Sequence, residues 1–405
     1  MRIAQINSTC GVGSTGKICD AISDLLDARN IENYIFYTVG KAPKKKSGYI
    51  KYGSDVYTKI QALRSRIFGN YGFNSKKTTK KLIGHLDAIK PDVVHLHNLH
   101  SHNCDLEMLF GYFKKNKVKL VWTFHDCWAF TGYCPHFTLE ECENWKTECK
   151  DCPVYKGFSF FRDKSNSNYC RKRELFSDLD VTVVTPSKWL AGLVKESFFK
   201  NAPVRVINNG IDLDTFKIYG SDFKKKLGCQ KEYLVLGVAY EWGKSKGLDV
   251  FIELSKRLPE RYKIVLVGTN DAVDKELPEN IISIHKTDDQ KQLAEIYSAA
   301  DVFVNPTRQE VFGLVNIEAL ACGTPVVMFN TGGSPECIDD SCGISVACED
   351  LDAMLNAVID ACELRHFSQD DCVNRASLFD ERRIYEAYAE LYCELYNTKN
   401  SKADK

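Results

Sequence analysis

The sequence has no excess charge of either sign, no long apolar run and no internal repeat. Its 54 Lys and Arg residues balance 54 Asp and Glu residues, so the net charge points to no class of partner. No apolar stretch reaches the roughly 18 residues that a membrane span needs. The longest, 313–329, is interrupted by Glu318 and by the turn residues 323–325. The apolar start, 1–6, is too short for a secretory signal. We therefore expect a cytoplasmic protein.

Chain length and the spacing of apolar segments indicate the fold class. The 405 residues exceed what one hydrophobic core usually supports, so we expect two domains. Short β-branched runs alternate with longer amphipathic stretches, which is typical of βαβ units and parallel sheets. The sequence thus predicts an α/β protein with two doubly wound, Rossmann-like domains. The expected strands are Arg2–Asn7, Tyr34–Val39, Val93–His97, Lys119–His125, Val181–Pro186, Val204–Asn208, Tyr233–Ala239, Tyr262–Val267, Ile281–His285, Val302–Asn305 and Pro325–Phe329.

A turn signal marks the junction between the domains. Asn208-Asn209-Gly210 follows an expected strand. We therefore place the first domain at 1–207 and the second at 208–380. The remaining residues, 381–405, are expected to form a terminal helix with an apolar stripe at helical spacing. That stripe consists of Tyr385, Tyr388, Tyr392 and Leu395.

Residues 310–327 carry the strongest functional signal. They follow an expected strand, and Gly313 opens a short helix that Gly323 closes. A helix that starts at the carboxyl end of a parallel strand presents free N–H groups and a positive dipole end, which suit a diphosphate. Glu310 lies before this helix, within reach of a sugar, and Glu318 lies further along it, where it can accept hydrogen bonds from a ribose. Two isolated glutamates would be ordinary surface acids, but the surrounding sequence favours a site.

The whole segment resembles the E-x7-E region of glycosyltransferase family 4, whose members have the two-domain GT-B fold. The resemblance extends over most of the chain. Asn209–Asp212 with Phe216 resembles the family's N-G-[IV]-D-x-x-x-F linker, and Gly332–Glu336 resembles its G-G-x-x-E loop. Pro186–Trp189 resembles its entry into the last helix of the first domain, and Pro91–His97 its P-D-[IV]-[IV]-H-x-H strand.

The resemblance implies a retaining glycosyltransferase with two domains that face each other across a cleft. The second domain would bind a nucleotide-diphosphate sugar, a UDP- or GDP-sugar, and the first would bind the acceptor. The terminal helix would pack back on the first domain. The acceptor would be a glycan or a polyprenyl-linked precursor in bacterial surface polysaccharide synthesis. A donor phosphate oxygen would take the acceptor's proton. The sequence has no D-x-D motif at the position where a metal would hold the diphosphate, so we expect no divalent cation in catalysis.

One part of the family pattern is altered. The usual G-R-x-x-x-x-K-G supplies an Arg and a Lys to the diphosphate, whereas here Lys246-Gly247 matches but the Arg position falls on Tyr240 or Glu241. A departing diphosphate needs cations or N–H groups nearby, so we expect Lys246 to serve first and Lys244 second. The expected donor-binding residues are Gly13, Gly16, Lys244, Lys246, Glu310, Phe312, Gly313, Leu314, Glu318 and Gly333.

A glycine-rich loop, Gly11–Lys17, nearly spells the P-loop motif G-x-x-x-x-G-K-[ST]. Ile18 stands where the Mg²⁺-binding hydroxyl should be, which argues against a P-loop ATPase. The plain interpretation is a tight turn between a strand and a helix. The resemblance instead places here a loop that closes on the donor phosphates or the acceptor, through Gly13 and Gly16.

Histidines lie in or directly after two expected strands of the first domain. His125, at the end of a strand, resembles the family histidine near the transferred sugar, and we expect it to hydrogen-bond the donor sugar or phosphate. Together with Glu310 and Lys246 it is an expected catalytic residue. Four other histidines are spaced closely enough to suggest a metal site, but we expect them to line the acceptor cleft or to pack in the core. They are His95, His97, His100 and His102.

Five of the seventeen cysteines lie in an insertion at 127–152, and the last four of them are the candidate metal ligands. Their spacing is C-x7-C-x6-C-x2-C, and the closing C-x-x-C is a common zinc half-site. Four thiolates leave no open position on a tetrahedral ion, so a zinc here would be structural. The alternative is reduced thiols, or disulfides that form on isolation. The four are Cys134, Cys142, Cys149 and Cys152, and a similar cysteine-bearing insertion occurs in polysaccharide-assembly members of the family.

The stretch 41–81 contains twelve Lys or Arg residues and one acid, Asp55, with interleaved aromatic residues. Such a mixture suits nucleic acid, but nothing else in this neutral chain supports that partner. A contact with anionic lipid fits better, so we expect peripheral association with the inner face of the plasma membrane. The alternative is a solvated face.

Two other functions compete with sugar transfer. A GT-B-fold nucleotide-sugar epimerase would act without an acceptor, and the match over the whole segment 310–327 argues against it. A catalytically silent sugar-binding relative is disfavoured because Glu310 and Glu318 are both present, although the altered Arg position favours it slightly. Incubation with donors alone would separate the three.

Overall fold

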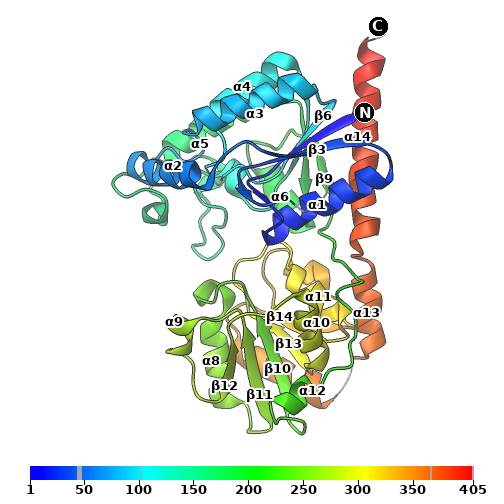
Figure 1. Ribbon diagram of the computed structural model, residues 1–405. Coiled ribbons are helices and arrows are strands. Elements are labelled where there is room, and N and C mark those ends of the chain that lie inside the picture. The colour runs from blue at the N-terminus through cyan, green and yellow to red at the C-terminus, as the bar shows by residue number, and fades with distance from the viewer. Residues whose placement is uncertain (43–47, 101, 365–366, 404–405) are drawn as a thin grey trace. The chain divides into compact units, whose positions relative to one another are not determined.

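The computed structural model describes residues 1–42, 48–100, 102–364 and 367–403. The chain divides into two compact units (Figure 1). Unit 1 is Met1–Asn208 with the residues from Arg382 onward, and unit 2 is Asn209–Glu381. Each unit is built on a parallel sheet, so the predicted α/β class is confirmed.

Unit 1 has a seven-stranded sheet in the order β5-β3-β1-β6-β7-β8-β9, with every pair parallel. The chain moves outward from β1 in one direction and then from β6 in the other, which is the doubly wound pattern with a switch point between β1 and β6. The strands are β1 (Arg2–Ile6), β3 (Glu32–Tyr37), β5 (Tyr49–Lys51), β6 (Val93–Leu96), β7 (Lys119–Thr123), β8 (Val181–Thr185) and β9 (Val204–Val206), beside the short pair β2 (Thr9–Cys10) and β4 (Val39–Gly40).

Three helices of unit 1, α2, α4 and α6, begin at side-chain caps. Ser54, Asp105 and Ser187 each accept a hydrogen bond from a backbone N–H of the first turn that follows. The helices are α1 (Gly13–Ala28), α2 (Asp55–Phe68), α3 (Lys76–Ile89), α4 (Leu106–Asn116), α5 (Ser165–Phe176), α6 (Lys188–Glu196) and α14 (Glu381–Ala403).

The terminal helix α14 packs on unit 1. Its expected apolar stripe is a buried face, because Tyr385, Tyr388 and Tyr392 lie in the core cluster of that unit. The hydroxyl of Tyr392 lies 2.6 Å from His95 Nδ1, and that of Tyr388 lies 3.0 Å from Thr123 Oγ1. These buried polar contacts fix the register of the helix on the sheet.

Unit 2 has a six-stranded parallel sheet in the order β12-β11-β10-β13-β14-β15. Both faces are covered, since Leu234 and Leu236 of β10 enter one core cluster and Val235 between them enters another. The strands are β10 (Tyr233–Val238), β11 (Tyr262–Val267), β12 (Ile281–Ile284), β13 (Val302–Asn305), β14 (Val326–Phe329) and β15 (Gly343–Val346). The helices are α7 (Phe223–Lys226), α8 (Leu248–Arg257), α9 (Asp271–Asp274), α10 (Gln290–Ala299), α11 (Leu314–Ala321), α12 (Leu351–Glu363) and α13 (Gln369–Ser377).

The structure adds two edge strands that the sequence did not indicate. β5 has three residues, and β15 contains a glycine and a serine among its four, so neither forms the apolar run that marked the other strands. Within the described ranges, every helix is too short or too polar to cross a bilayer.

Candidate active site

The segment 306–313 links β13 to α11, where the sequence predicts an anion site. Gly313 has a φ of +90°, and a Cβ there would come within 2.7 Å of Asn316 Nδ2, so both the backbone and the space require glycine. Asn305 Nδ2 donates to Asn316 Oδ1 at 2.7 Å, which ties the end of β13 to the first turn of α11. The first N–H groups of α11 therefore lie at the carboxyl edge of the sheet, as an anion site requires.

A glycine pair after β14 holds the backbone of Glu310. A Cβ on Gly332, whose φ is +58°, would lie 1.8 Å from the Glu310 carbonyl oxygen, so no side chain fits. The N–H of Gly333 donates to the same oxygen at 3.2 Å. The N–H of Gly333, a residue expected from the sequence to bind the donor, is thus engaged in positioning Glu310.

Lys246 and Glu310 lie together in unit 2. Lys246 Nζ is 3.0 Å from Glu310 Oε2 and 3.4 Å from Thr307 Oγ1. Both side chains keep part of their surface exposed, 36% for the lysine and 22% for the glutamate. The residue expected at the phosphates and the residue expected at the sugar are therefore brought into contact beside the start of α11.

Arg308 organises the loop that carries Lys244 and Lys246, a role that no sequence motif indicates. It is 5% exposed and its guanidinium forms ion pairs with Asp249 and Glu349. It also donates to the carbonyl of Lys244, and its own N–H donates to the carbonyl of Ser245 at 2.8 Å. The bond to Glu349 and the charge of Asp249 raise the pKa of Arg308 further. Because two carboxylates neutralise it, Arg308 does not replace the missing family arginine.

The altered Arg position is open to solvent. Tyr240 is fully exposed and lines, with Trp242 and Lys246, a pocket that does not include Lys244. Trp242 is itself mostly buried, and its ring packs edge-on against Phe251 at 5.4 Å. Lys246 is thus the lysine of this loop that faces the pocket, while the Lys244 side chain lies exposed.

Two hydroxyls in the loop after β14 are buried without a hydrogen-bond partner among the described residues, Thr331 Oγ1 and Ser334 Oγ. Ser334 Oγ lies 3.4 Å from the position of a Cβ on Gly313, beside the start of α11. A buried hydroxyl that forms no bond costs free energy, so both groups are available to a ligand or a water molecule. Sequence reasoning missed both residues, because Ser and Thr are common in loops.

The other expected donor-binding residues of unit 2 differ in their surroundings. Glu318, on α11, accepts a hydrogen bond from Tyr297 at 3.3 Å. Phe312 is 2% exposed and packs against Phe379, so its side chain belongs to the core and only its backbone is available to a donor. Leu314 is partly buried against the same core.

In unit 1 the expected catalytic histidine lies two residues beyond the end of β7. His125 Nε2 is 3.1 Å from His97 Nδ1, and His97 Nε2 is 3.2 Å from Gln5 Oε1. Burial, and then the charges of neighbouring histidines, hold the pKa of His97 well below its usual value. Burial lowers the pKa of His125 to about 4. Both imidazoles are therefore neutral at neutral pH.

The hydrogen bonds of Gln5 fix the tautomers of both rings. Gln5 Nε2 donates to the carbonyl of Cys19 at 3.1 Å, so Oε1 is the atom that faces His97. His97 Nε2 must then carry a proton, which leaves its Nδ1 as an acceptor. His125 Nε2 accordingly donates to His97, and His125 Nδ1 is left as an acceptor with no partner among the described residues. A neutral acceptor nitrogen suits a sugar hydroxyl and not a phosphate oxygen.

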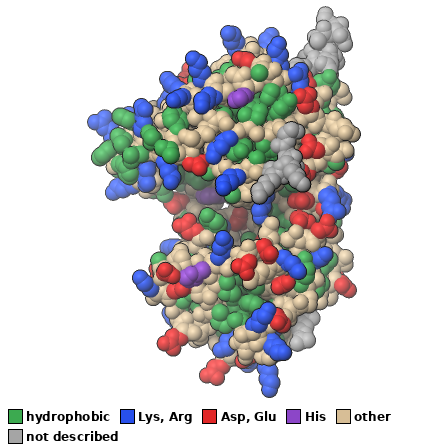
Figure 2. All heavy atoms as spheres, in the orientation of Figure 1, with side chains coloured by type: hydrophobic (Ala, Val, Ile, Leu, Met, Phe, Trp, Pro, Cys, Tyr) green, Lys and Arg blue, Asp and Glu red, His purple; other side chains and the backbone are tan. Residues whose placement is uncertain are grey.

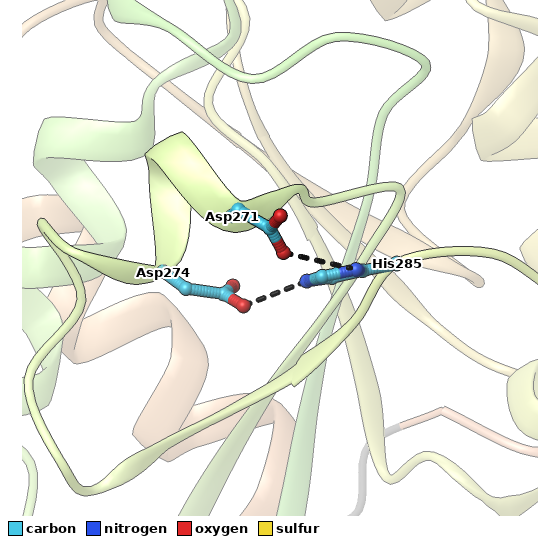
Figure 3. Close-up of side chains that lie close together, drawn as sticks. All are labelled: Asp271, Asp274 and His285. Carbon is cyan, nitrogen blue, oxygen red and sulfur yellow. Dashed lines mark hydrogen bonds and ion pairs between the residues drawn. The ribbon is translucent and has the colours of Figure 1, made fainter.

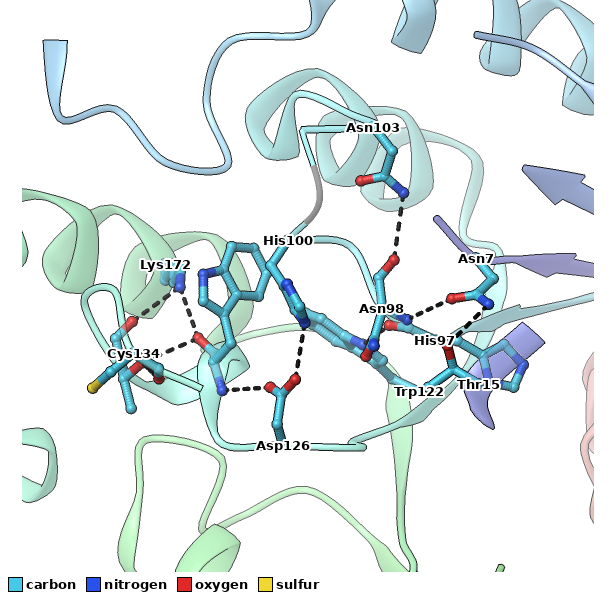
Figure 4. Close-up of polar contacts among 12 residues, drawn as sticks. Asn7, Thr15, His97, Asn98, His100, Asn103, Trp122, Asp126, Cys134 and Lys172 are labelled. Atoms are coloured by element: carbon cyan, nitrogen blue, oxygen red, sulfur yellow. Dashed lines mark hydrogen bonds and ion pairs between the residues drawn. The ribbon is translucent and has the colours of Figure 1, made fainter. Parts of the chain in front are cut away.

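The remaining histidines of this region contact neighbouring polar side chains and rings. His95 contacts Tyr392 and Thr123, at 2.6 and 2.7 Å. His100 Nε2 lies 2.9 Å from Asp126 Oδ2 (Figure 4). Burial alone would raise the pKa of Asp126, but the charge and hydrogen bond of His100 lower it to about 2.

The glycine-rich loop of unit 1 leads into α1, which starts at Gly13. The N-cap residue, Val12, offers no side-chain cap, and Gly13 has a φ of +71°. A Cβ on Gly16 would lie 3.4 Å from the backbone N of Gly11, which is close to ordinary van der Waals contact. Asn7 Nδ2 bonds Thr15 Oγ1 at 3.4 Å, which ties the loop to the end of β1 (Figure 4).

The four cysteines of the insertion line one small pocket, together with Trp145. The N–H of Gly132 donates to Cys149 Sγ at 3.3 Å, and Lys172 anchors the loop by donating to the carbonyls of Trp128 and Thr131. Within the described part of the chain, however, the one group of three ligand residues whose atoms all lie within 4.8 Å of one another is Asp271, Asp274 and His285. The cysteines are gathered but not closed into metal-ligand geometry.

That group of three lies on the surface of unit 2. His285 Nε2 is 2.6 Å from Asp274 Oδ2, and its Nδ1 is 3.9 Å from Asp271 Oδ1 (Figure 3). The bond to Asp274 raises the pKa of His285. All three side chains are exposed, which makes the group an ordinary surface ion pair.

Comparisons with known proteins define the class of this fold. Sucrose-phosphate synthase from Thermosynechococcus elongatus superposes with a TM-score of 0.71 at 19% identity, covering 98% of this chain and 99% of that one. HepE of Anabaena, solved in complex with UDP-glucose, superposes with a TM-score of 0.69 at 15% identity over 97% and 100% of the two chains. The chain has the GT-B fold of glycosyltransferases.

Sequence comparison gives the family. The profile of Glycosyltransferase Family 4 matches residues 17–215, and that of Glycosyl transferases group 1 matches residues 230–363. WcaC of Escherichia coli (strain K12), named as a colanic acid biosynthesis glycosyl transferase, is 24% identical over 87% of this chain and 88% of its own length. The lipopolysaccharide core biosynthesis mannosyltransferase LpsB of Rhizobium meliloti (strain 1021) is 29% identical, over 45% of this chain and 55% of its own length. The chain is a glycosyltransferase that belongs to family 4.

Proposed function

We propose that the protein transfers a sugar, with retention of anomeric configuration, from a UDP- or GDP-sugar to a glycan or polyprenyl-linked acceptor in bacterial surface polysaccharide synthesis. The contact between Lys246 and Glu310 beside the start of α11 carries this proposal. The names of WcaC and LpsB support the polysaccharide context, and the UDP-glucose complex of HepE supports the class of donor.

Each group of the unit 2 site has a role in this proposal. The N–H groups at the start of α11 and the Ser334 hydroxyl bind the diphosphate, and Lys246 balances its charge as it departs. Glu310, held at its backbone by Gly332, contacts the transferred sugar. Glu318 accepts hydrogen bonds from the ribose. Lys244 provides a second, more distant positive charge.

In unit 1, His125 accepts a hydrogen bond from a hydroxyl of the transferred sugar through Nδ1. Its pKa of about 4 makes it a poor base at neutral pH. The acceptor's proton therefore goes to an oxygen of the departing diphosphate, on the face from which the acceptor attacks, and the configuration is retained. The glycine-rich loop with Gly13 and Gly16 closes on the donor phosphates.

A panel of UDP-, GDP-, dTDP- and ADP-sugars in a thermal-shift assay tests the donor. A ligand at 100 times its Kd stabilises the folded state by about 2.7 kcal/mol, so one donor base should stand out. Equal shifts with all four, or none, would contradict the proposal. Incubation with the selected donor alone then separates the functions: slow release of nucleoside diphosphate supports a transferase, a changed sugar an epimerase, and an unchanged donor a silent binder.

The cysteine insertion is proposed to hold a structural zinc through Cys134, Cys142, Cys149 and Cys152. Two observations support this: all four line one pocket, and Cys149 Sγ accepts a backbone hydrogen bond of the kind that zinc-bound thiolates form. Zinc binding would draw the four sulfurs closer together than they now lie. It would stabilise the loop and take no part in transfer.

A further inference from the structure

Exposed large apolar side chains are concentrated at one end of unit 1. Thirteen such residues are exposed in the described part of the chain, and seven of them belong to α2 and to the loop residues 160–161. Isolated exposed apolar residues are normal, but a contiguous patch usually marks an interaction site. The seven, called here the α2 surface, are Val56, Ile60, Leu63, Ile67, Phe68, Phe160 and Phe161.

Helix α2 has its apolar stripe turned outward. Ile60, Leu63 and Phe68 are 51%, 54% and 60% exposed, whereas the inward face carries Gln61, 3% exposed, and Ser65, 0% exposed. Gln61 Oε1 and Ser65 Oγ have no hydrogen-bond partner among the described residues. An amphipathic helix normally buries its apolar stripe in the core. The apolar stripe of α2 is instead exposed and available to a partner.

The loop at 160–161 extends the apolar stripe of α2. The N–H of Phe160 donates to the carbonyl of Arg66 at 2.7 Å, and Arg66 donates to the carbonyl of Gly157 at 3.1 Å. The Arg66 guanidinium also lies 4.7 Å from the centre of the Phe160 ring. These bonds hold Phe160 and Phe161 beside the C-terminal turn of α2, so helix and loop form one surface.

The charges around this surface are positive. Lys59, Arg64 and Arg66 are exposed on α2 itself, and its one acid, Asp55, is paired with Lys51 at 3.2 Å. Helix α3 adds four exposed lysines. Figure 2 shows the green side chains of this end of unit 1 bordered by blue ones. The lysines of α3 are Lys76, Lys77, Lys80 and Lys81.

We propose that the α2 surface docks on an anionic lipid bilayer, with α2 lying in the plane of the interface. A helix with an outward apolar stripe and Lys and Arg beside it has the pattern of interfacial helices. The lysines of α2 and α3 favour lipid over a protein partner, because the cores of protein interfaces are depleted in lysine. The basic residues would bind the lipid headgroups, and the apolar side chains of α2 would enter the acyl region. The proposal concerns binding and does not rest on turnover.

The test is sedimentation of the full chain with vesicles of phosphatidylcholine alone and of phosphatidylcholine with 30% phosphatidylglycerol, a composition of roughly cytoplasmic-leaflet charge. The triple variant Ile60→Ser, Leu63→Ser and Phe161→Ser removes the apolar part. The matched control, Ile218→Ser, Leu364→Ser and Leu378→Ser, removes three comparably exposed apolar side chains from unit 2. We expect binding to the anionic vesicles to fall at least about tenfold in the first variant and to be unchanged in the control.

The charge component is tested by Lys59→Gln with Arg64→Gln, against Lys275→Gln with Lys286→Gln in unit 2. Each cation near an anionic surface contributes about fivefold in partitioning, so the first pair should lose about 25-fold and the control little. Unchanged binding in both α2 variants, or equal losses in α2 and control variants, would overturn the proposal. So would a change of oligomeric mass in the triple variant without any change in vesicle binding, since that result would make α2 a protein interface.

Discussion

Replacing Lys246 by alanine isolates the charge that is proposed to face the departing diphosphate. Its ammonium lies 3.0 Å from Glu310 Oε2, in a pair whose side chains are 36% and 22% exposed. Pairs with this much exposure contribute under about 1 kcal/mol to stability. The variant should therefore fold normally, with a free energy of unfolding within about 1 kcal/mol of the wild type.

The effect on turnover should be much larger. Removing one group that stabilises developing negative charge costs about 3 to 4 kcal/mol, which corresponds to a loss of roughly 100- to 1,000-fold in kcat/KM. The loss has a second cause here, because Lys246→Ala leaves the Glu310 carboxylate without its cation beside the phosphate site. The Tyr240 position offers no replacement charge, and Arg308 is neutralised by Asp249 and Glu349.

The assay is release of nucleoside diphosphate at several donor concentrations, compared with Lys256→Ala. That control removes a lysine from another ion pair of unit 2, with Glu253 at 3.2 Å, which lies on the exposed face of α8. A Lys246→Ala enzyme that keeps kcat/KM within about twofold of the Lys256→Ala enzyme would refute the role given to this lysine.

Three further predictions follow from the geometry. Gly332→Ala would set a Cβ 1.8 Å from the Glu310 carbonyl oxygen, so it should lower the melting temperature and abolish the donor-induced thermal shift. The control Gly84→Ala adds a Cβ in open space on α3 and should be neutral or stabilising. Equal melting temperatures of the two variants would contradict this prediction. The pKa of His125 is about 4 in the folded chain and 6.5 in the unfolded chain, so the unfolded chain binds more protons between these pH values. The free energy of unfolding should therefore fall by about 3 kcal/mol as the pH drops from 6.5 to 4. Denaturant titrations of a His125→Asn variant should lack this part of the pH dependence, and an unchanged dependence would contradict the prediction. Metal analysis should find about one zinc per chain, lost in Cys149→Ser, and a content under about 0.2 would reject the zinc site.

Much of the unit 2 site is visible in the sequence because local rules place it. Gly313 is demanded by a left-handed backbone, and the strand before it and the helix after it follow from apolar spacing, so the position of Glu310 could be predicted. Arg308 could not, because its partners Asp249 and Glu349 are brought to it only by the packing of unit 2. Ser334 carries no sequence signal, since a buried, unpartnered hydroxyl is a property of the fold.

The same limit applies in unit 1. The spacing of Val56, Ile60 and Leu63 is typical of an amphipathic helix, but it does not indicate that the apolar stripe of that helix is exposed to solvent. The histidine pattern located His97 and His125, whereas the bond from Gln5 that fixes their tautomers joins residues 92 positions apart. The sequence therefore identifies the groups, and the structure decides their protonation and their partners.

The central claim is most directly tested by ¹H NMR of the protein incubated with its selected donor and no acceptor. We expect slow release of nucleoside diphosphate together with free sugar whose first-formed anomer has the configuration of the donor, and no release by a variant that carries both Lys246→Ala and Glu310→Ala. A donor that stays intact, that returns as a different nucleotide sugar, or that is hydrolysed equally by the double variant would contradict the account.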